Sequence, residues 1–129
     1  MINNALKKMI EENILGLATA DKLGNPHNIA VGHVKVVSES QLVISDNYLD
    51  ETLKNIEKNP NVSLVVWHSD WKKACIGYEL KGSAEYFTEG EWVDFIKKIP
   101  VNKEEPCKGA VLVTINKTKL LHEKWNDEV

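Results

Sequence analysis

Apolar side chains recur at intervals of three and four residues in three segments of the chain, and this spacing is typical of amphipathic helices. Charged and polar residues fill the positions between them. An Asn-Pro pair terminates the second of these segments, as expected where a helix must stop. The sequence therefore predicts three short helices, over residues 2–13, 50–58 and 89–99.

Six further segments are rich in β-branched and aliphatic residues, and turn-forming residues separate them. The predicted strands are residues 14–20, 27–37, 41–45, 62–68, 74–87 and 110–115. Strands with short connections pair antiparallel, and such a sheet commonly curls into a barrel that leaves few open edges. We therefore predict a single domain, residues 1–129, with an α+β, mainly β fold: a six-stranded antiparallel barrel with flanking helices.

Gly32 interrupts the second predicted strand. A glycine inside a strand marks either a bend or bulge of the barrel, or a place where a ligand must approach the backbone closely. The residues alone leave both interpretations open.

The charge balance excludes several classes of partner. The chain carries 16 basic and 19 acidic residues, a formal net charge of −3, and every basic residue is a lysine. Without a basic excess we expect no nucleic-acid partner. The apolar runs are too short to span a bilayer, so we expect no membrane insertion. Two cysteines in unrelated contexts and the lack of a secretory signal pattern predict a cytoplasmic location.

Catalytic motifs are sparse. No histidine has a His or Cys partner at the spacing of a metal site, so we expect no metal. No nucleophile motif and no evident general acid or base occurs, and the catalytic residues therefore stay unassigned.

The junction between the third predicted strand and the second predicted helix is a better candidate, as an anion site. Helix N-terminal N–H groups, together with Thr52 and Lys54, suit a phosphate. On the residues alone, however, Asp50 and Glu51 in the same turn favour an ordinary helix start over a phosphate site, because acidic residues suit the helix dipole there and would repel a phosphate.

The order of short motifs along the chain resembles the pyridoxamine 5'-phosphate oxidase-like FMN-binding split barrels, and it is closest to their small free-standing members. The resemblance covers about residues 6–121. Each motif is weak alone, but the set in this order is specific. The motifs are Gly16-Leu17-Ala18-Thr19-Ala20, Gly24-x-Pro26-His27-Asn28, Val31-Gly32-His33-Val34-Lys35-Val36, Asp46-Asn47-Tyr48, Thr52-x-x-Asn55, Asn59-Pro60-x-Val62 and Gly77-Tyr78-Glu79-Leu80-Lys81-Gly82-Ser83-Ala84.

The resemblance implies a split barrel that binds FMN, as a homodimer with flavin sites at the subunit interface. Residues 30–34 would run beside the flavin ring, residues 45–47 would line the ribityl chain, and Thr52 and Lys54 would reach the phosphate. The expected cofactor-binding residues are Ala30, Val31, Gly32, His33, Val34, Ser45, Asp46, Asn47, Thr52 and Lys54. We expect apolar residues of two late strands to supply the dimer interface, namely Val62, Leu64, Val66, Ala110, Leu112 and Val113.

Glu51 departs from the family pattern, because many relatives carry a lysine immediately before the threonine. A carboxylate at that place opposes a bound phosphate, so Lys54 must compensate or the affinity for phosphate is lower.

The resemblance also implies a reaction class. It favours an FMN-dependent oxidoreductase, either a flavin reductase or an electron-transfer flavoprotein, with NAD(P)H or a redox protein as its partner. The vitamin-forming oxidases of the family use arginine to hold a substrate phosphate, so a chain without arginine is not expected to perform that oxidation. The alternatives are a non-catalytic flavin-binding or sensing barrel, and the same fold with haem or a deazaflavin as ligand.

Overall fold

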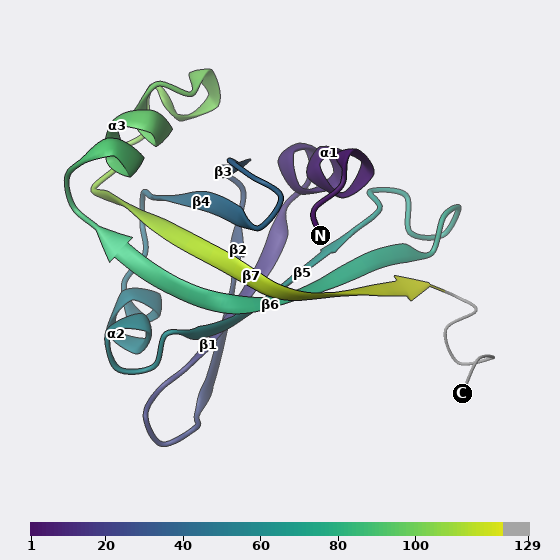
Figure 1. The fold of residues 1–129 in the computed structure, drawn as a ribbon, viewed down its shortest axis with the longest axis horizontal. Helices are drawn as coiled ribbons and strands as arrows, with labels where there is room; N and C mark the ends of the chain where they lie inside the picture. Colours follow the sequence, from purple (N-terminus) through teal and green to yellow (C-terminus); the bar gives the residue numbers. More distant parts are fainter. Residues whose placement is uncertain (123–129) are drawn as a thin grey trace.

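A computed structural model of the chain describes residues 1–122, in which one curled antiparallel sheet is flanked by three helices and a 3-10 turn (Figure 1). The mainly β architecture predicted from the sequence is confirmed. The elements are α1 (Asn4–Glu12), β1 (Leu15–Ala20), β2 (Pro26–Val31), β3 (Val34–Val36), β4 (Gln41–Asp46), α2 (Glu51–Lys58), β5 (Asn61–Trp67), β6 (Ile76–Phe87), α3 (Glu91–Lys97), η1 (Pro100–Asn102) and β7 (Gly109–His122).

The strand count differs by one from the prediction, because residues 27–37 form two strands. The sheet has seven strands in the order β2-β1-β5-β6-β7-β4-β3. β2 and β3 therefore lie on opposite edges although only Gly32 and His33 separate them in the chain. The sheet must curl for so short a link to join its two edges.

The last strand is longer than predicted. β7 pairs with β4 through residues 109–114 and with β6 through residues 110–115 and 117–122. The prediction ended at residue 115, because four polar residues, 116–119, follow it. Residues 117–122 nonetheless continue the pairing with β6, since an antiparallel strand can present polar side chains to solvent.

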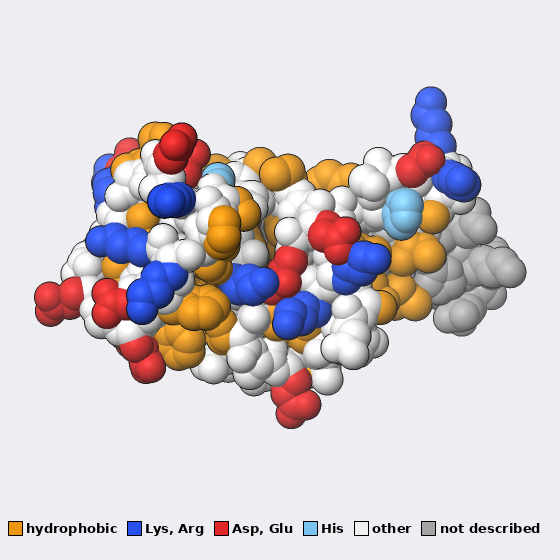
Figure 2. All heavy atoms as spheres, turned by 90° about the horizontal axis from the view of Figure 1, so that it is seen from above, with side chains coloured by type: hydrophobic (Ala, Val, Ile, Leu, Met, Phe, Trp, Pro, Cys, Tyr) orange, Lys and Arg blue, Asp and Glu red, His pale blue; other side chains and the backbone are white. Residues whose placement is uncertain are grey.

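The helices cover different parts of the sheet. α1 contacts β3 and β5, α2 contacts β1 and β6, and α3 contacts β4 and β7. The main apolar core lies inside the curl, and a smaller apolar cluster lies between α3 and the sheet. On the face that carries α1 and α3, lysines are interspersed with Asp and Glu side chains (Figure 2). No helix among residues 1–122 is long and apolar enough to cross a membrane.

The six apolar residues expected at a subunit interface are buried within the chain instead. They come from strands in the middle of the sheet, which contribute to the core of a single subunit. The large apolar side chains that remain exposed in the strands and the β5–β6 connection are Trp67, Trp71, Ile76 and Leu120.

Asp46 anchors the end of β4. Its carboxylate is fully buried and accepts hydrogen bonds from the Tyr86 hydroxyl at 2.6 Å and the Leu49 backbone N–H at 3.0 Å. The Asp46 carbonyl accepts from the Lys108 N–H at 2.7 Å. These bonds tie the segment that follows β4 to β6 and to the start of β7.

Gly82 lies where the register between β6 and β7 shifts by one residue. A Cβ atom there would overlap the Thr114 carbonyl oxygen and come within 3.1 Å of the Ile115 Cα. Since the obstacle is backbone, no side-chain rotation relieves it.

Replacing Gly82 by alanine is expected to lower the free energy of unfolding by about 1–3 kcal/mol, the usual range for overpacking. Denaturant unfolding followed by circular dichroism measures the change. The exposed neighbour Ser83 is the matched control, and Ser83→Ala should change stability by less than about 0.5 kcal/mol. Equal effects of the two substitutions would contradict the close approach at Gly82.

The Tyr86–Asp46 bond predicts a pH dependence. Burial and the hydrogen bond to Asp46 raise the pKa of Tyr86 from 10.0 to about 12. Because the folded pKa is the higher one, the contribution of this group is complete below pH 10.0 and is lost as the pH rises towards 12. Tyr86→Phe should lower stability at neutral pH by about 1.5–3 kcal/mol, since the acceptor is charged.

Unfolding curves across this pH window test the assignment. Between pH 10.0 and about 12, the free energy of unfolding of the wild type should fall more steeply than that of Tyr86→Phe. Parallel profiles would show that Tyr86 is not the group responsible. Tyr78→Phe removes a hydroxyl that has no hydrogen-bond partner within residues 1–122, and it serves as the control.

Candidate functional site

A cavity of about 280 Å³ lies where β2 passes into β3 and where β4 ends; we name it the strand-crossing cavity. Two segments distant in the sequence meet there because the curl brings the edges of the sheet together. Six of the predicted cofactor-binding residues line it: Ala30, Val31, Gly32, His33, Ser45 and Asn47. The other lining residues, Ile29, Tyr48 and Leu49, were not among those predicted to bind the cofactor.

A second cavity of about 90 Å³, which we name the rear cavity, shares Gly32 and His33 with the first. The short link between β2 and β3 is thus a wall common to both spaces. Val34, also predicted to bind the cofactor, lines only the rear cavity, together with Asn102.

Three buried polar side chains form a closed ring beside the strand-crossing cavity. The Ser45 hydroxyl donates to Asn47 Oδ1 at 2.7 Å, Asn47 Nδ2 donates to Asn102 Oδ1 at 3.0 Å, and Asn102 Nδ2 donates to Ser45 Oγ at 2.9 Å. Two backbone groups join the ring: the Ile96 carbonyl accepts from Asn102, and the Cys107 N–H donates to Asn47. Every polar atom of the ring is therefore satisfied, which offsets the cost of its burial.

The ring also contacts His33. Asn47 Nδ2 lies 3.4 Å from His33 Nδ1, and the His33 carbonyl accepts from the Ser45 N–H at 3.0 Å. The link between β2 and β3 is thereby attached to the end of β4.

Gly32 is not required by its backbone conformation. Its φ is not positive, and the only atom within 4 Å of an added Cβ is the Ile14 Cδ1, at 2.8 Å. That atom is the end of a flexible, exposed side chain, which can move aside for a larger residue at position 32. A bend of the barrel therefore does not by itself require a glycine there.

Thr52 is the one residue within the described chain whose buried side-chain oxygen has no hydrogen-bond partner. The side chain is 1% exposed and lies in the first turn of α2. Asp50, at the start of this helix, makes no side-chain capping bond. A buried hydroxyl without a partner costs free energy unless another group completes it.

Lys54 is exposed, and its ammonium group lies 3.5 Å from an Asp50 carboxylate oxygen. Neither Thr52 nor Lys54 lines the strand-crossing cavity. Their assignment to a phosphate therefore stays a prediction.

Glu51 is paired with His27 of β2, with 2.8 Å between its carboxylate oxygen and the imidazole Nδ1. The Glu51 side chain stays 64% exposed while it makes this pair. When His27 carries a proton, the pair is neutral overall.

Asp46, predicted to line the ribityl chain, is absent from the lining of the strand-crossing cavity, and its carboxylate is engaged by Tyr86 and Leu49. Asn102, which completes the polar ring, was not among the predicted site residues. The available signal was an asparagine at the end of a proline-initiated turn.

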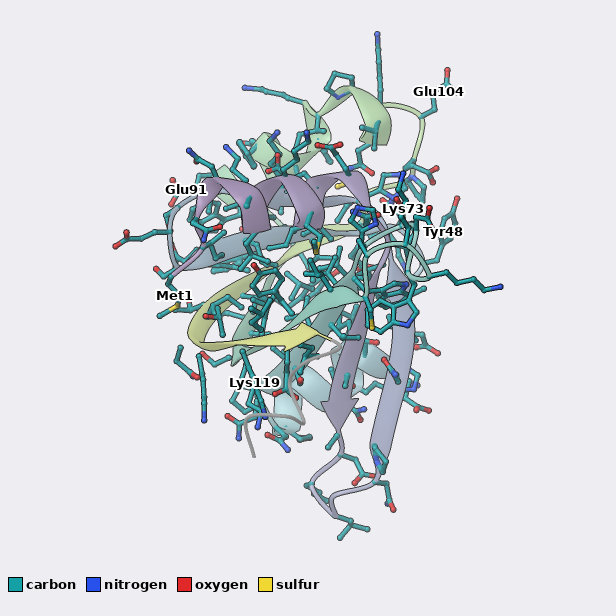
Figure 3. All side chains as sticks on the ribbon, turned by 90° about the vertical axis from the view of Figure 1, so that its right-hand side faces the viewer. Met1, Tyr48, Lys73, Glu91, Glu104 and Lys119 are labelled. Atoms are coloured by element: carbon teal, nitrogen blue, oxygen red, sulfur yellow. The ribbon has the colours of Figure 1, made fainter. Side chains whose placement is uncertain are left out.

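Tyr48 sits at the surface beside the site (Figure 3), and its hydroxyl donates to Glu105 at 3.0 Å. Residues 1–122 contain no group of three or more His, Cys, Asp or Glu side chains that could hold a metal ion.

Comparisons with known proteins agree with this architecture. Among curated proteins, the uncharacterised protein MJ0282 of Methanocaldococcus jannaschii is 32% identical over 118 residues, which cover 88% of this chain and 76% of that protein. HupZ from Group A Streptococcus has the same fold, with a TM-score of 0.85 at 22% identity over 95% of this chain and 96% of its own. An FMN-binding protein from Syntrophomonas wolfei has a TM-score of 0.79 at 19% identity, over 89% of this chain and 82% of its own.

Solved structures of this fold differ in function: one is an F420 reductase, and another is the haem storage protein HutZ of Vibrio cholerae. The fold alone therefore does not select the ligand. The sequence profile described as pyridoxamine 5'-phosphate oxidase matches residues 2–121, nearly the whole chain. The chain belongs to the pyridoxamine 5'-phosphate oxidase-like split-barrel family.

Proposed function

We propose that this chain binds FMN at the strand-crossing cavity and acts as an oxidoreductase, either a flavin reductase or an electron-transfer flavoprotein. The observation that carries the proposal is the convergence of residues 30–33 with Ser45 and Asn47 around one cavity. The family match and the FMN-binding relative of the same fold support it.

The lining suits a flat heteroaromatic ring with one polar edge. Ile29, Val31 and Leu49 supply apolar surface, while the backbone at Gly32 and the imidazole of His33 supply polar groups. A bound flavin supplies hydride or electron transfer, and the protein positions the ring and tunes its electronics.

The first turn of α2 suits the phosphate of FMN. The Thr52 hydroxyl lacks a partner, and helix N-terminal N–H groups carry partial positive charge. The pairing of Glu51 with His27 reduces the repulsion that a free carboxylate would exert on the phosphate.

The proposal includes a homodimer in which the second copy completes the flavin site. The strand-crossing cavity of about 280 Å³ is at or below the lower end of ligand-pocket volumes, roughly 300–1,000 Å³, so one subunit does not enclose a molecule as large as FMN. The exposed Trp67, Trp71, Ile76 and Leu120 offer apolar surface for such an interface.

The absorption spectrum of the purified protein tests the ligand. We expect the two near-ultraviolet and visible bands of an oxidised flavin, whereas a Soret band would replace FMN by haem. Mixing the flavin-loaded protein with NADH or NADPH without oxygen should bleach the visible band. If neither nicotinamide donor nor a reduced redox protein reduces the flavin, the oxidoreductase function is excluded. A flavin-binding or sensing role then replaces it.

Thr52→Val tests the phosphate site with little change in shape. Since the Thr52 hydroxyl has no partner without ligand, the variant should be as stable as the wild type or more so. It should bind FMN about tenfold more weakly and riboflavin, which lacks the phosphate, with unchanged affinity. Isothermal titration of apoprotein with both ligands measures this.

Thr19→Val is the matched control. Thr19 is also buried, but its hydroxyl accepts from Asn55 Nδ2 at 3.0 Å, so its loss should destabilise the apoprotein. Equal losses of FMN and riboflavin affinity in Thr52→Val would place the phosphate elsewhere.

A further inference from the structure

Two backbone groups form hydrogen bonds to the polar ring of Ser45, Asn47 and Asn102, and each of them can act only as a donor or only as an acceptor. The Ile96 carbonyl can only accept, and it lies 3.2 Å from Asn102 Nδ2. The Cys107 N–H can only donate, and it lies 3.2 Å from Asn47 Oδ1. Cys107 holds this position in a left-handed conformation, with a φ of 37°, which few residues other than glycine adopt. Because the Ile96 carbonyl needs a donor and the Cys107 N–H needs an acceptor, Asn102 must turn its amide nitrogen to Ile96, and Asn47 must turn its amide oxygen to Cys107.

The direction of each hydrogen bond in the ring follows from these anchors. Asn102 Nδ2 uses its two hydrogens on the Ile96 carbonyl and on Ser45 Oγ. The Ser45 hydroxyl must then donate to Asn47 Oδ1. Asn47 Nδ2 gives one hydrogen to Asn102 Oδ1, and its second hydrogen is left for His33 Nδ1, 3.4 Å away.

We infer that this ring selects one tautomer of the neutral His33 imidazole, with its hydrogen on Nε2, so that His33 is a directed hydrogen-bond donor to the ligand of the strand-crossing cavity. In the other neutral tautomer a hydrogen on His33 Nδ1 would face the Asn47 amide hydrogens, so this contact would be lost. Asn47 and Asn102 are positioning residues in this arrangement, and His33 is the one of these three side chains that keeps a hydrogen for the ligand.

The surroundings of His33 leave its Nε2 for that purpose. Nε2 has no hydrogen-bond partner within residues 1–122, and His33 is among the residues that line both cavities. Glu11 is the carboxylate that lines the rear cavity with it, and this carboxylate is occupied by the Lys35 ammonium at 3.2 Å and the Val36 N–H at 2.9 Å. The inference deepens the proposed function and rests on it for the ligand: the donor suits a carbonyl oxygen or ring nitrogen of a flavin.

Nitrogen-15 NMR of the apoprotein at alkaline pH tests the tautomer without any ligand. For His33 we expect a protonated-type Nε2 and an unprotonated-type Nδ1 in a single tautomer, with the signals assigned by comparison with His33→Gln. A mixture of tautomers, or a hydrogen on Nδ1, would overturn the inference. His68 is an internal reference, because its Nδ1 accepts from the Asp70 N–H at 3.0 Å away from the site.

Asn47→Asp tests whether the ring sets the tautomer. A carboxylate oxygen in place of Nδ2 accepts a hydrogen, so His33 should acquire one on Nδ1; an unchanged tautomer in the folded variant would contradict the role of Asn47. Should this variant fail to fold, Asn102→Ala removes the anchor of the Asn47 amide and should convert the single tautomer of His33 into a mixture.

FMN titrations test the donor. His33→Gln keeps an N–H donor and should bind FMN close to wild-type affinity, whereas His33→Leu should bind it about three- to tenfold more weakly, as for a lost neutral hydrogen bond. His68→Leu should have no effect. Equal affinities of the Gln and Leu variants would overturn the donor role and leave FMN binding intact. A wild-type chain that does not bind FMN would instead overturn the proposed function, and the NMR measurement would still decide the tautomer.

Discussion

The link between β2 and β3 is the constraint on which the rest of the structure depends. Seven strands spaced about 4.8 Å apart would place the edges of a flat sheet roughly 29 Å from each other. Only Gly32 and His33 lie between the two edge strands, and three Cα–Cα steps span at most about 11 Å. The sheet must therefore curl until its edges nearly meet. The cavities on both sides of this link follow from the strand order, so the backbone topology sets the position of the candidate site.

The polar residues at the end of β4 make this closure rigid. Ser45, Asp46 and Asn47 are all buried at the point where a strand normally gives way to solvated loop. Burial of these groups would be costly without partners, and each finds them in a later part of the chain: Asp46 in Tyr86, Ser45 and Asn47 in Asn102. A buried polar network that has lost a partner is less stable than an apolar core. The α3–η1 segment supplies Asn102, so it must stay in place for the link between β2 and β3 to keep its shape.

Local patterns were enough to predict the helices, most of the strands and the segment around Gly32, because amphipathic spacing and turn residues are properties of neighbouring positions. They did not predict that residues 27–37 divide between two edges of the sheet, which follows from the closure as a whole. They could not identify Asn102 either, since its partner Ser45 lies 57 residues away and an asparagine in a loop is ordinary. The pairing of Glu51 with His27 was missed for the same reason: both residues were assessed only against their neighbours in sequence.

The lack of arginine gives this site its chemical character. Lysine is a point charge, so any planar or bidentate recognition has to come from neutral donors with fixed directions. The amides of Asn47 and Asn102, whose orientations are set by one backbone carbonyl and one backbone N–H, use their hydrogens on the polar ring, on the Ile96 carbonyl and on His33. The directed donor that this arrangement leaves for the proposed ligand is His33 Nε2. Near α2 the charges are paired with each other, Glu51 with His27 and Lys54 with Asp50, and the buried Thr52 hydroxyl is left without a partner. The proposed ligand would therefore meet preorganised dipoles rather than free charges, and such dipoles favour one orientation of a neutral heteroaromatic ring more strongly than they favour anions in general.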